Sequence, residues 1–190
     1  MTTTPALTIA NPSWVADIAD GGRVYTSDED KMRLVVTLAR ENVIREAGGP
    51  FAAAVFEIDT GRLVAAGVNS VVRLRSSALH AEIMALMMAQ HGRGAFSLGV
   101  AGLPAHGLIV SCEPCAMCLG AILWSGVRHV VHAADGVDAR RLGFEEGPVF
   151  PETYRYLEDR GIAFTRGVLA DDARAVLRLY HERGGPIYNG

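Results

Sequence analysis

Four residues able to bind a metal or move a proton stand in two short segments of the chain. His80 and Glu82 lie in the first segment, and Cys115 and Cys118 lie in the second. Zinc prefers nitrogen and sulfur ligands in a tetrahedral arrangement, and a catalytic site uses three protein ligands and leaves one position open for water. One histidine and two cysteines meet that count. We therefore predict that His80, Cys115 and Cys118 bind one zinc ion.

The spacing within each segment fits this chemistry. Cys115 and Cys118 are three residues apart, so on a helix they share one face, and Pro114 suits the first turn of that helix. The positive end of the helix dipole there favours thiolates. Glu82 is two residues from His80, which places it on another face of its helix. A carboxylate beside an open metal position can take a proton from water and return it to a substrate, so we assign that role to Glu82.

Each residue alone has a structural explanation, because single CxxC pairs and buried histidines are common. Together, His-x-Glu followed roughly thirty residues later by Pro-Cys-x-x-Cys is the signature of zinc deaminases. Cys112 leaves an alternative open, because a fourth ligand closes the tetrahedron and makes the zinc structural. Its place at a strand end predicts that it points into the core.

The apolar periodicity predicts strands that alternate with helices. Met32, Leu34, Val35 and Leu38 recur at helical spacing behind a capping Ser27. The predicted elements are a helix over 28–46, a hairpin of strands 51–58 and 62–68, a helix from His80, a strand over 108–111, a helix over 115–124, a strand over 128–134, a helix over 154–159, an extended segment over 163–169, and a last helix capped by Asp171 and Asp172 and ending near 183. This order predicts a layered α/β sandwich.

Composition predicts one domain over residues 1–190, because 190 residues with 49% hydrophobic side chains can bury a single core. Residues 1–26 form an N-terminal extension and residues 184–190 a tail near the active site. The start of the chain lacks the pattern of a signal peptide, and no run of eighteen apolar residues predicts a membrane span. Three cysteines without a disulfide pattern favour the cytoplasm. The net charge of -3 disfavours nucleic acid as a partner.

Several motifs resemble one enzyme family. Gly49-Pro50-Phe51, Asn69, His80-Ala81-Glu82 and the run from Ser111 to Cys118 are similar to the cytidine-deaminase-fold nucleobase deaminases, and most of all to bacterial guanine deaminases. The resemblance implies a three-layer α/β/α sandwich with a mixed five-stranded sheet. It also implies a homodimer with one zinc ion per subunit.

The resemblance implies further site residues. Asn69 is expected to hydrogen-bond the base, with Phe51 and Phe144 flanking its ring and Ala81 in the same binding site. Glu146 is expected to assist proton delivery to the leaving amine. Core packing is the competing explanation for Phe51, and a solvent-exposed loop acid is the competing explanation for Glu146.

The expected activity is zinc-dependent hydrolytic deamination of a free nucleobase or related amino-heterocycle, of guanine or amino-triazine type, with release of ammonia. Such an enzyme is a hydrolase acting on the C–N bonds of cyclic amidines. Many relatives carry Asp-Pro-Thr-Ala before His-Ala-Glu, whereas this chain reads Arg-Ser-Ser-Ala-Leu over 75–79. Leu79 is expected to narrow the pocket and to disfavour guanine.

Three alternatives stay open at this stage. A cytosine deaminase or a deaminase of another modified base shares the zinc chemistry and differs in pocket shape. A transfer-RNA adenosine deaminase shares the motifs, but its substrate favours a basic surface that this acidic chain does not predict. A non-catalytic zinc module uses the metal only for folding energy. The tail around Tyr188 is expected to close its own pocket, to close a partner's, or to be disordered.

Overall fold

The computed structural model describes residues 6–189, so the first five residues of the predicted extension and the last residue of the tail lie outside it. Its strands form one five-stranded sheet in the order β2-β1-β3-β4-β5. The strands are β1 (Ala52–Glu57), β2 (Leu63–Val68), β3 (His106–Cys112), β4 (His129–Ala134) and β5 (Ala163–Arg166). β1 pairs antiparallel with β2 and β3, whereas β3, β4 and β5 run parallel. The predicted mixed sheet and hairpin are confirmed.

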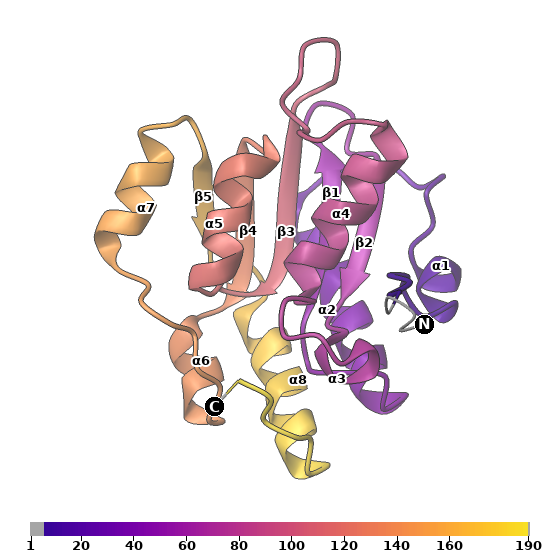
Figure 1. Cartoon of the computed structure of the whole chain (residues 1–190), viewed down its shortest axis with the longest axis vertical. Helices are drawn as coiled ribbons and strands as arrows, with labels where there is room; N and C mark the ends of the chain where they lie inside the picture. The colour runs from indigo at the N-terminus through magenta and orange to yellow at the C-terminus, as the bar shows by residue number, and fades with distance from the viewer. Residues whose placement is uncertain (1–5, 190) are drawn as a thin grey trace, which may run out of the picture.

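Helices cover both faces of the sheet (Figure 1). On one face lie α2 (Asp28–Ile44) and α8 (Ala170–Glu182), and on the other lie α4 (Ala81–Arg93), α5 (Ala116–Ser125) and α7 (Pro151–Glu158). The short helices α1 (Trp14–Ile18), α3 (Val71–Leu74) and α6 (Gly136–Arg141) complete the fold. The structure confirms the predicted three-layer α/β/α sandwich. Within residues 6–189, no helix has the length and apolar character needed to cross a membrane.

The two faces of the sheet have separate hydrophobic cores. Side chains alternate along a strand, so β1 sends Ala54 and Phe56 toward the α2 and α8 face and Ala53 and Val55 toward the α4 and α5 face. Every residue of β1 is buried as a result. An apolar run without alternation is the sequence pattern of such a doubly covered strand.

Several element ends differ from the sequence prediction: α7 begins at Pro151 instead of residue 154, and β3 begins at His106 instead of residue 108. The predicted cap of the last helix is wrong: Leu169, at φ 53°, precedes α8, and Asp171 and Asp172 lie in its first turn. There their negative charges interact favourably with the positive end of the helix dipole. The preceding strand ends at Arg166 instead of residue 169. The helices α1, α3 and α6 were not predicted, because four to six residues are too few to show a helical period.

Candidate active site

The starts of α4 and α5 bring the three predicted zinc ligands together. His80 directly precedes α4, Cys115 directly precedes α5, and Cys118 lies in the first turn of α5. His80 Nδ1 lies 3.5 Å from the Cys115 Sγ and 3.8 Å from the Cys118 Sγ. All three ligand atoms lie within 4.8 Å of one another. Two helix starts on one face of the sheet thus build one donor cluster.

These distances fit a zinc ion. Zn–S bonds of about 2.3 Å and a Zn–N bond of about 2.0 Å, at a tetrahedral angle, separate sulfur from nitrogen by about 3.5 Å. The two observed separations, 3.5 and 3.8 Å, match this value. One imidazole and two thiols leave the fourth position of a tetrahedron for another group, which is the arrangement of a catalytic site.

The ligand cluster already stabilises negative charge. A hydrogen bond from the Cys118 thiol, with further help from His80, lowers the pKa of Cys115 to about 4 despite its burial. The unpaired N–H groups at the start of α5 act in the same direction. Cys115 is therefore prepared to bind a cation as a thiolate.

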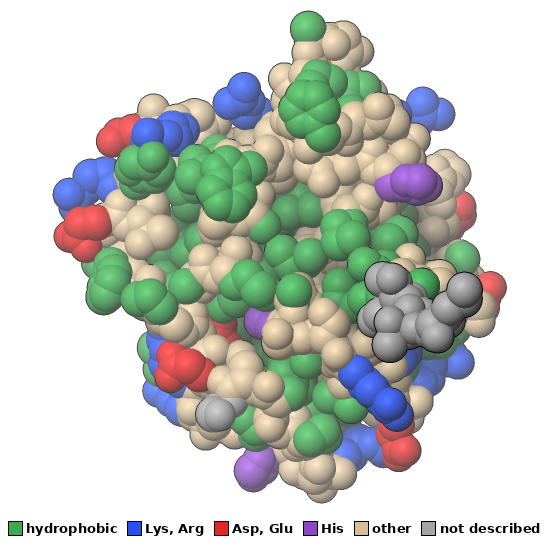
Figure 2. Space-filling view, in the orientation of Figure 1, with side chains coloured by type: hydrophobic (Ala, Val, Ile, Leu, Met, Phe, Trp, Pro, Cys, Tyr) green, Lys and Arg blue, Asp and Glu red, His purple; other side chains and the backbone are tan. Residues whose placement is uncertain are grey.

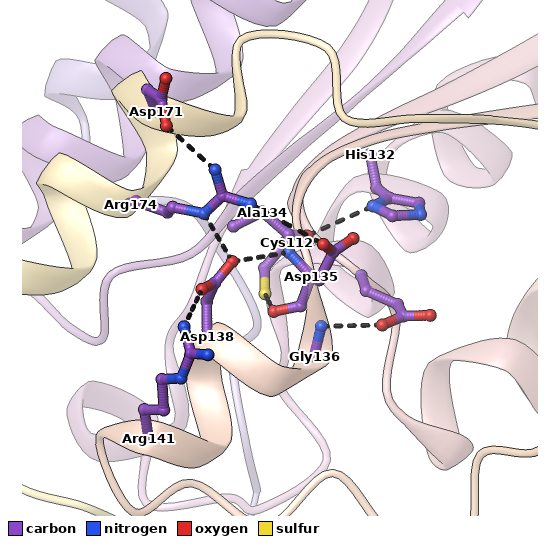
Figure 3. Close-up of polar contacts among 10 residues, drawn as sticks. Cys112, His132, Ala134, Asp135, Gly136, Asp138, Arg141, Asp171 and Arg174 are labelled. Atoms are coloured by element: carbon purple, nitrogen blue, oxygen red, sulfur yellow. Dashed lines mark hydrogen bonds and ion pairs between the residues drawn. The ribbon is translucent and has the colours of Figure 1, made fainter.

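Cys112 does not belong to this cluster. Its buried thiol donates a hydrogen bond to the backbone oxygen of Asp135, with 3.6 Å between the sulfur and the oxygen (Figure 3). Among the described residues the metal-ligand group consists of His80, Cys115 and Cys118 alone. The tetrahedron is therefore not closed by a third cysteine.

Two buried carboxylates, Glu82 and Glu146, lie beside the ligand cluster. Glu82 in the first turn of α4 is 7% exposed, and Glu146 in the loop between α6 and α7 is 8% exposed. Burial, followed by the negative charge of Cys115, raises the pKa of Glu82 to about 7 and that of Glu146 to about 8. Carboxyl groups with such pKa values can both accept and donate protons near neutral pH. The backbone oxygen of Glu146 accepts a hydrogen bond from Ala116 N at 2.9 Å, which ties this loop to α5.

A small pocket opens onto these groups. Its walls come from the starts of α4, α5 and β1, the end of β3, the loop around Asn69, the Glu146 loop and the C-terminal tail. The lining residues are Phe51, Ala52, Asn69, His80, Glu82, Val110, Ser111, Cys112, Glu113, Cys115, Glu146, Tyr188 and Asn189. The pocket thus joins residues from 51 to 189 in one site.

Asn69 presents a hydrogen-bond donor to the pocket. Its Oδ1 accepts from the backbone N–H groups of Gly49 and Val71 at 3.4 and 3.3 Å. Its buried Nδ2 has no partner among the described residues. Asn42 steadies this region, because its Nδ2 donates to the backbone oxygens of Gly49 and Asn69 at 2.8 and 3.0 Å. The orientation of the Asn69 amide is therefore fixed by the backbone around it.

The predicted aromatic residues lie at different depths. Phe51 lines the pocket, but Phe144 lies behind it, with its ring centroid 5.1 Å from that of Phe51 and 5.1 Å from that of Tyr188. Phe144 supports the wall instead of facing the pocket. Ala81 packs in the core between α4 and the sheet. Leu79 is buried outside the pocket lining, so the expectation that it narrows the pocket is wrong.

The C-terminal tail closes the pocket of its own chain. Asn189 and Glu145 exchange two hydrogen bonds, from Asn189 Nδ2 to Glu145 O at 2.8 Å and from Glu145 N to Asn189 O at 3.1 Å. Tyr188 lines the pocket, and its hydroxyl packs against Gly49. The remaining cavity of about 20 Å³ has the room of a single water molecule. Closure of its own pocket was one of the expectations for the tail around Tyr188, whereas no role in the pocket was predicted for Ala52 or Val110.

Residues 25–134, more than half of the chain, match the profile of the cytidine and deoxycytidylate deaminase zinc-binding region. The chain belongs to this deaminase family. The deaminase is a hydrolase that acts on a C–N bond and uses one zinc ion per subunit, with its His/Cys/Cys cluster inside the matched region.

Known relatives narrow the comparison. Guanine deaminase of Bacillus subtilis is 36% identical over 143 residues, which cover 75% of this deaminase and 87% of the relative. A solved structure of guanine deaminase from Nitrosomonas europaea shares 46% identity, covers 96% of this chain and 100% of that chain, and has a TM-score of 0.89. A solved complex with 2,6-diaminopurine shares 48% identity, covers 97% of both chains, and has a TM-score of 0.90. The expected nucleobase deaminase fold is confirmed.

Proposed function

We propose that this deaminase hydrolyses the exocyclic amine of free guanine or of a closely related amino-heterocycle and releases ammonia. One observation supports this proposal most strongly. The same pocket contains the fixed N–H donor of Asn69, two buried carboxylates and the zinc-ligand cluster. The similarity to guanine deaminases from two bacteria supports the same substrate. The proposed functional unit is the single domain of the whole chain, with the tail as part of its site.

The proposed roles divide between metal and protein. His80, Cys115 and Cys118 hold the zinc ion, which when bound supplies a Lewis acid that lowers the pKa of water. Glu82 holds a proton and transfers it from water to a ring nitrogen of the substrate. Glu146 delivers a proton to the leaving amine. Two carboxylates suit these steps because water loses a proton early in the reaction and the amine must gain one late.

The Asn69 amide determines which edge of the substrate ring can face it. Its Nδ2 donates, so the substrate atom that faces it must be an acceptor such as a carbonyl oxygen or an unprotonated ring nitrogen. Guanine offers both. A ring that presents an amine there leaves two donors facing each other in a buried site, which costs about 1–3 kcal/mol.

Replacing Asn69 by alanine is expected to lower kcat/KM for guanine by about 10- to 100-fold, because the substrate acceptor then has no partner in a buried site. The measurement is steady-state ammonia release, with zinc content and melting temperature recorded for both proteins. An unchanged kcat/KM in a zinc-loaded, folded variant contradicts the assignment.

Substrate choice is tested by ammonia release from zinc-loaded protein with guanine, ammeline, cytosine, adenine and their nucleosides. We expect turnover of guanine or ammeline and none of the nucleosides. Turnover of cytosine alone supports the alternative enzyme. A transfer RNA is assayed beside the panel, and its turnover alone supports the transfer-RNA adenosine deaminase alternative. Absence of turnover in every case overturns the proposal.

Substrate entry requires the tail to move. A cavity of about 20 Å³ cannot hold a purine ring, and Tyr188 and Asn189 form its cover. The contacts between Asn189 and Glu145 are two exposed hydrogen bonds, each worth about 1 kcal/mol. We propose that the tail opens for the base and closes over it, which excludes water from the ring during the reaction.

We further propose that the deaminase is a homodimer, in the cytoplasm where its three thiols stay reduced. Hydrophobic side chains gather over α4 and α5 on the face that Figure 2 shows. Met117 is 40% exposed and Trp124 is 76% exposed on the outer side of α5. Exposed apolar side chains at i and i+7 on one helix, beside a second helix, are typical of an interface.

Replacing Trp124 by glutamate is therefore expected to convert the dimer to monomer at micromolar concentration, as measured by sedimentation equilibrium. A buried charge without a partner costs several kcal/mol at such a contact. The matched control is Ile44→Glu, because Ile44 is 40% exposed at the end of α2 on the opposite face of the sheet. Loss of the dimer in the control variant alone, or a monomeric unaltered protein, contradicts the proposed face.

A further inference from the structure

We propose that Glu113 is a positioning residue for Glu146: its carboxylate holds both ends of the chain segment that carries Glu146. The inference rests on the proposed role of Glu146 in proton delivery. Glu113 directly follows β3 and stands two residues before the predicted ligand Cys115. Its position thus links the ligand helix to the segment that runs from α6 to α7.

Each oxygen of the Glu113 carboxylate has its own donor. Oε2 accepts a hydrogen bond from the backbone N–H of Gly136 at 2.7 Å, and Figure 3 labels Gly136 at the start of α6. Oε1 accepts from the hydroxyl of Tyr154, which is a residue of α7. A Cβ atom at position 136 would lie 2.9 Å from Oε2, so a larger residue there requires the Glu113 carboxylate to shift. One side chain therefore joins the end of β3 to two helices.

The segment between these two contacts contains Glu146. Residues 142–150 form neither helix nor strand, so their place depends on where α6 ends and α7 begins. The backbone of Glu146 adds a contact with Ala116 at the start of α5. Phe144 packs against Phe51 on the other side. Fixing α6 and α7 relative to Cys115 thus fixes the Glu146 carboxyl relative to the ligand cluster.

The α6 end of this segment is anchored a second time. Asp138 of α6 accepts a hydrogen bond from Arg174 Nε of α8 at 2.8 Å, and Arg174 also contacts Asp135 and Asp171 (Figure 3). That network joins α6 to α8, whereas the Glu113 contacts join α6 and α7 to the start of α5. Two kinds of contact therefore link the Glu146 segment to the ligand helix: the backbone hydrogen bond from Ala116 to Glu146, and the Glu113 carboxylate, which holds α6 and α7.

Glu113 lines the pocket, yet its oxygens are engaged within the protein. Tyr154 in turn is held by the ring of Phe164, 5.0 Å away, and by Arg166 above its ring at 4.4 Å. The carboxylate therefore acts on neighbouring helices and not on a bound ring. An effect of Glu113 on turnover must pass through residues that it positions.

Small displacements matter for this chemistry. Proton transfer needs heavy atoms about 2.6–3.2 Å apart, and a misplacement of about 1 Å can cost about 100-fold in rate. Removing one of the two contacts of Glu113 therefore lowers kcat without removing a group that binds the ring. The expected signature is a fall in kcat with little change in KM.

The experiment is a double-mutant cycle with Glu113→Gln and Glu146→Gln, assayed on the best substrate of the panel. Glutamine keeps one oxygen for the Gly136 N–H, but its N–H₂ group can only donate, so the Tyr154 hydroxyl must turn from donor to acceptor. Two charge-assisted contacts thus become weaker neutral ones. We expect Glu113→Gln to lower kcat by about 10- to 100-fold with KM within about threefold. In the Glu146→Gln background the further loss should be less than about threefold, because Glu113 acts through Glu146.

Glu57→Gln is the matched control. Glu57 is also a buried carboxylate with two side-chain partners, Thr60 and Arg93, at the end of β1 and away from the ligand cluster. This variant should lower the melting temperature and leave kcat unchanged. Tyr154→Phe removes the hydrogen bond from the Tyr154 hydroxyl to Glu113 Oε1 without changing any charge. It should lower kcat in the same way as Glu113→Gln.

Hydrogen exchange separates failure of this inference from failure of the proposed function. Glu113→Gln should speed amide exchange in residues 142–150, and Glu57→Gln should not, whether or not any base is turned over. Unchanged exchange, equal losses of kcat in both backgrounds, or a rise in KM with constant kcat each overturn the inference. An inactive unaltered protein whose Glu113 variant shows faster exchange overturns the proposed function and keeps the positioning contact.

Discussion

Replacing Glu82 by glutamine lowers kcat for the preferred base by about 10³- to 10⁴-fold, while the protein keeps one zinc ion per chain. The reason is chemical: glutamine has the shape of glutamate but cannot take a proton from water. Glu82 is buried beside the ligand cluster without serving as one of its three donors. The measurement combines single-turnover kinetics with metal analysis of the same preparation.

The outcome separates an enzyme from a structural zinc domain. A structural site tolerates Glu82→Gln because nothing in its metal binding depends on proton transfer. Full turnover in a zinc-loaded variant contradicts the role of Glu82 as proton carrier. Loss of zinc together with turnover also contradicts it, since the carboxylate then supports the metal site itself.

The second large effect is expected for Cys118→Ala. This change removes one of three donors and leaves a histidine and one cysteine, so zinc affinity falls by several orders of magnitude and turnover disappears. Cys118 is fully buried, and the substitution also removes core volume next to α4. Metal content by atomic spectroscopy and ammonia release are measured together, before and after zinc is added back.

Cys112→Ala serves as the control for the loss of a buried thiol, and it should keep one zinc ion per chain. Its thiol contacts the backbone of Asp135 and lies outside the ligand group. If Cys118→Ala keeps its zinc and Cys112→Ala loses it, the ligand assignment is wrong. Equal loss in both variants points to collapse of the local structure instead.

The ligand cluster could be predicted from the sequence because its information is local. Cys115 and Cys118 are spaced for one helix face, and His80 and Cys115 each directly precede a helix. Metal chemistry fixes the number and kind of donors, so these residue types at these helix starts leave few other arrangements. A layered α/β sandwich followed similarly from the order of the apolar runs, whereas the three layers and the mixed five-stranded sheet were expected from the resemblance to the deaminase family.

The rest of the pocket depends on contacts that no local pattern records. Asn189 meets Glu145 across 44 residues, and Glu113 meets Tyr154 across 41. Phe144 was expected to face the ring, but the turn at Gly143, with φ 98°, is part of a backbone path that leaves its side chain behind Phe51. Side-chain direction in irregular segments is set by tertiary packing, which sequence periodicity does not describe.

The closed tail also decides how this protein can be handled. Tyr188 and Asn189 pack over the pocket, so any peptide joined after them begins at the mouth of the catalytic site. A purification tag or fusion partner at that end competes with closure and with entry of the base. Such additions belong at the N-terminal end, where Leu7 is exposed and no residue of the pocket lies nearby in sequence. We expect a fusion partner joined after Gly190 to lower turnover, whereas a fusion partner at the N-terminal end should leave it unchanged.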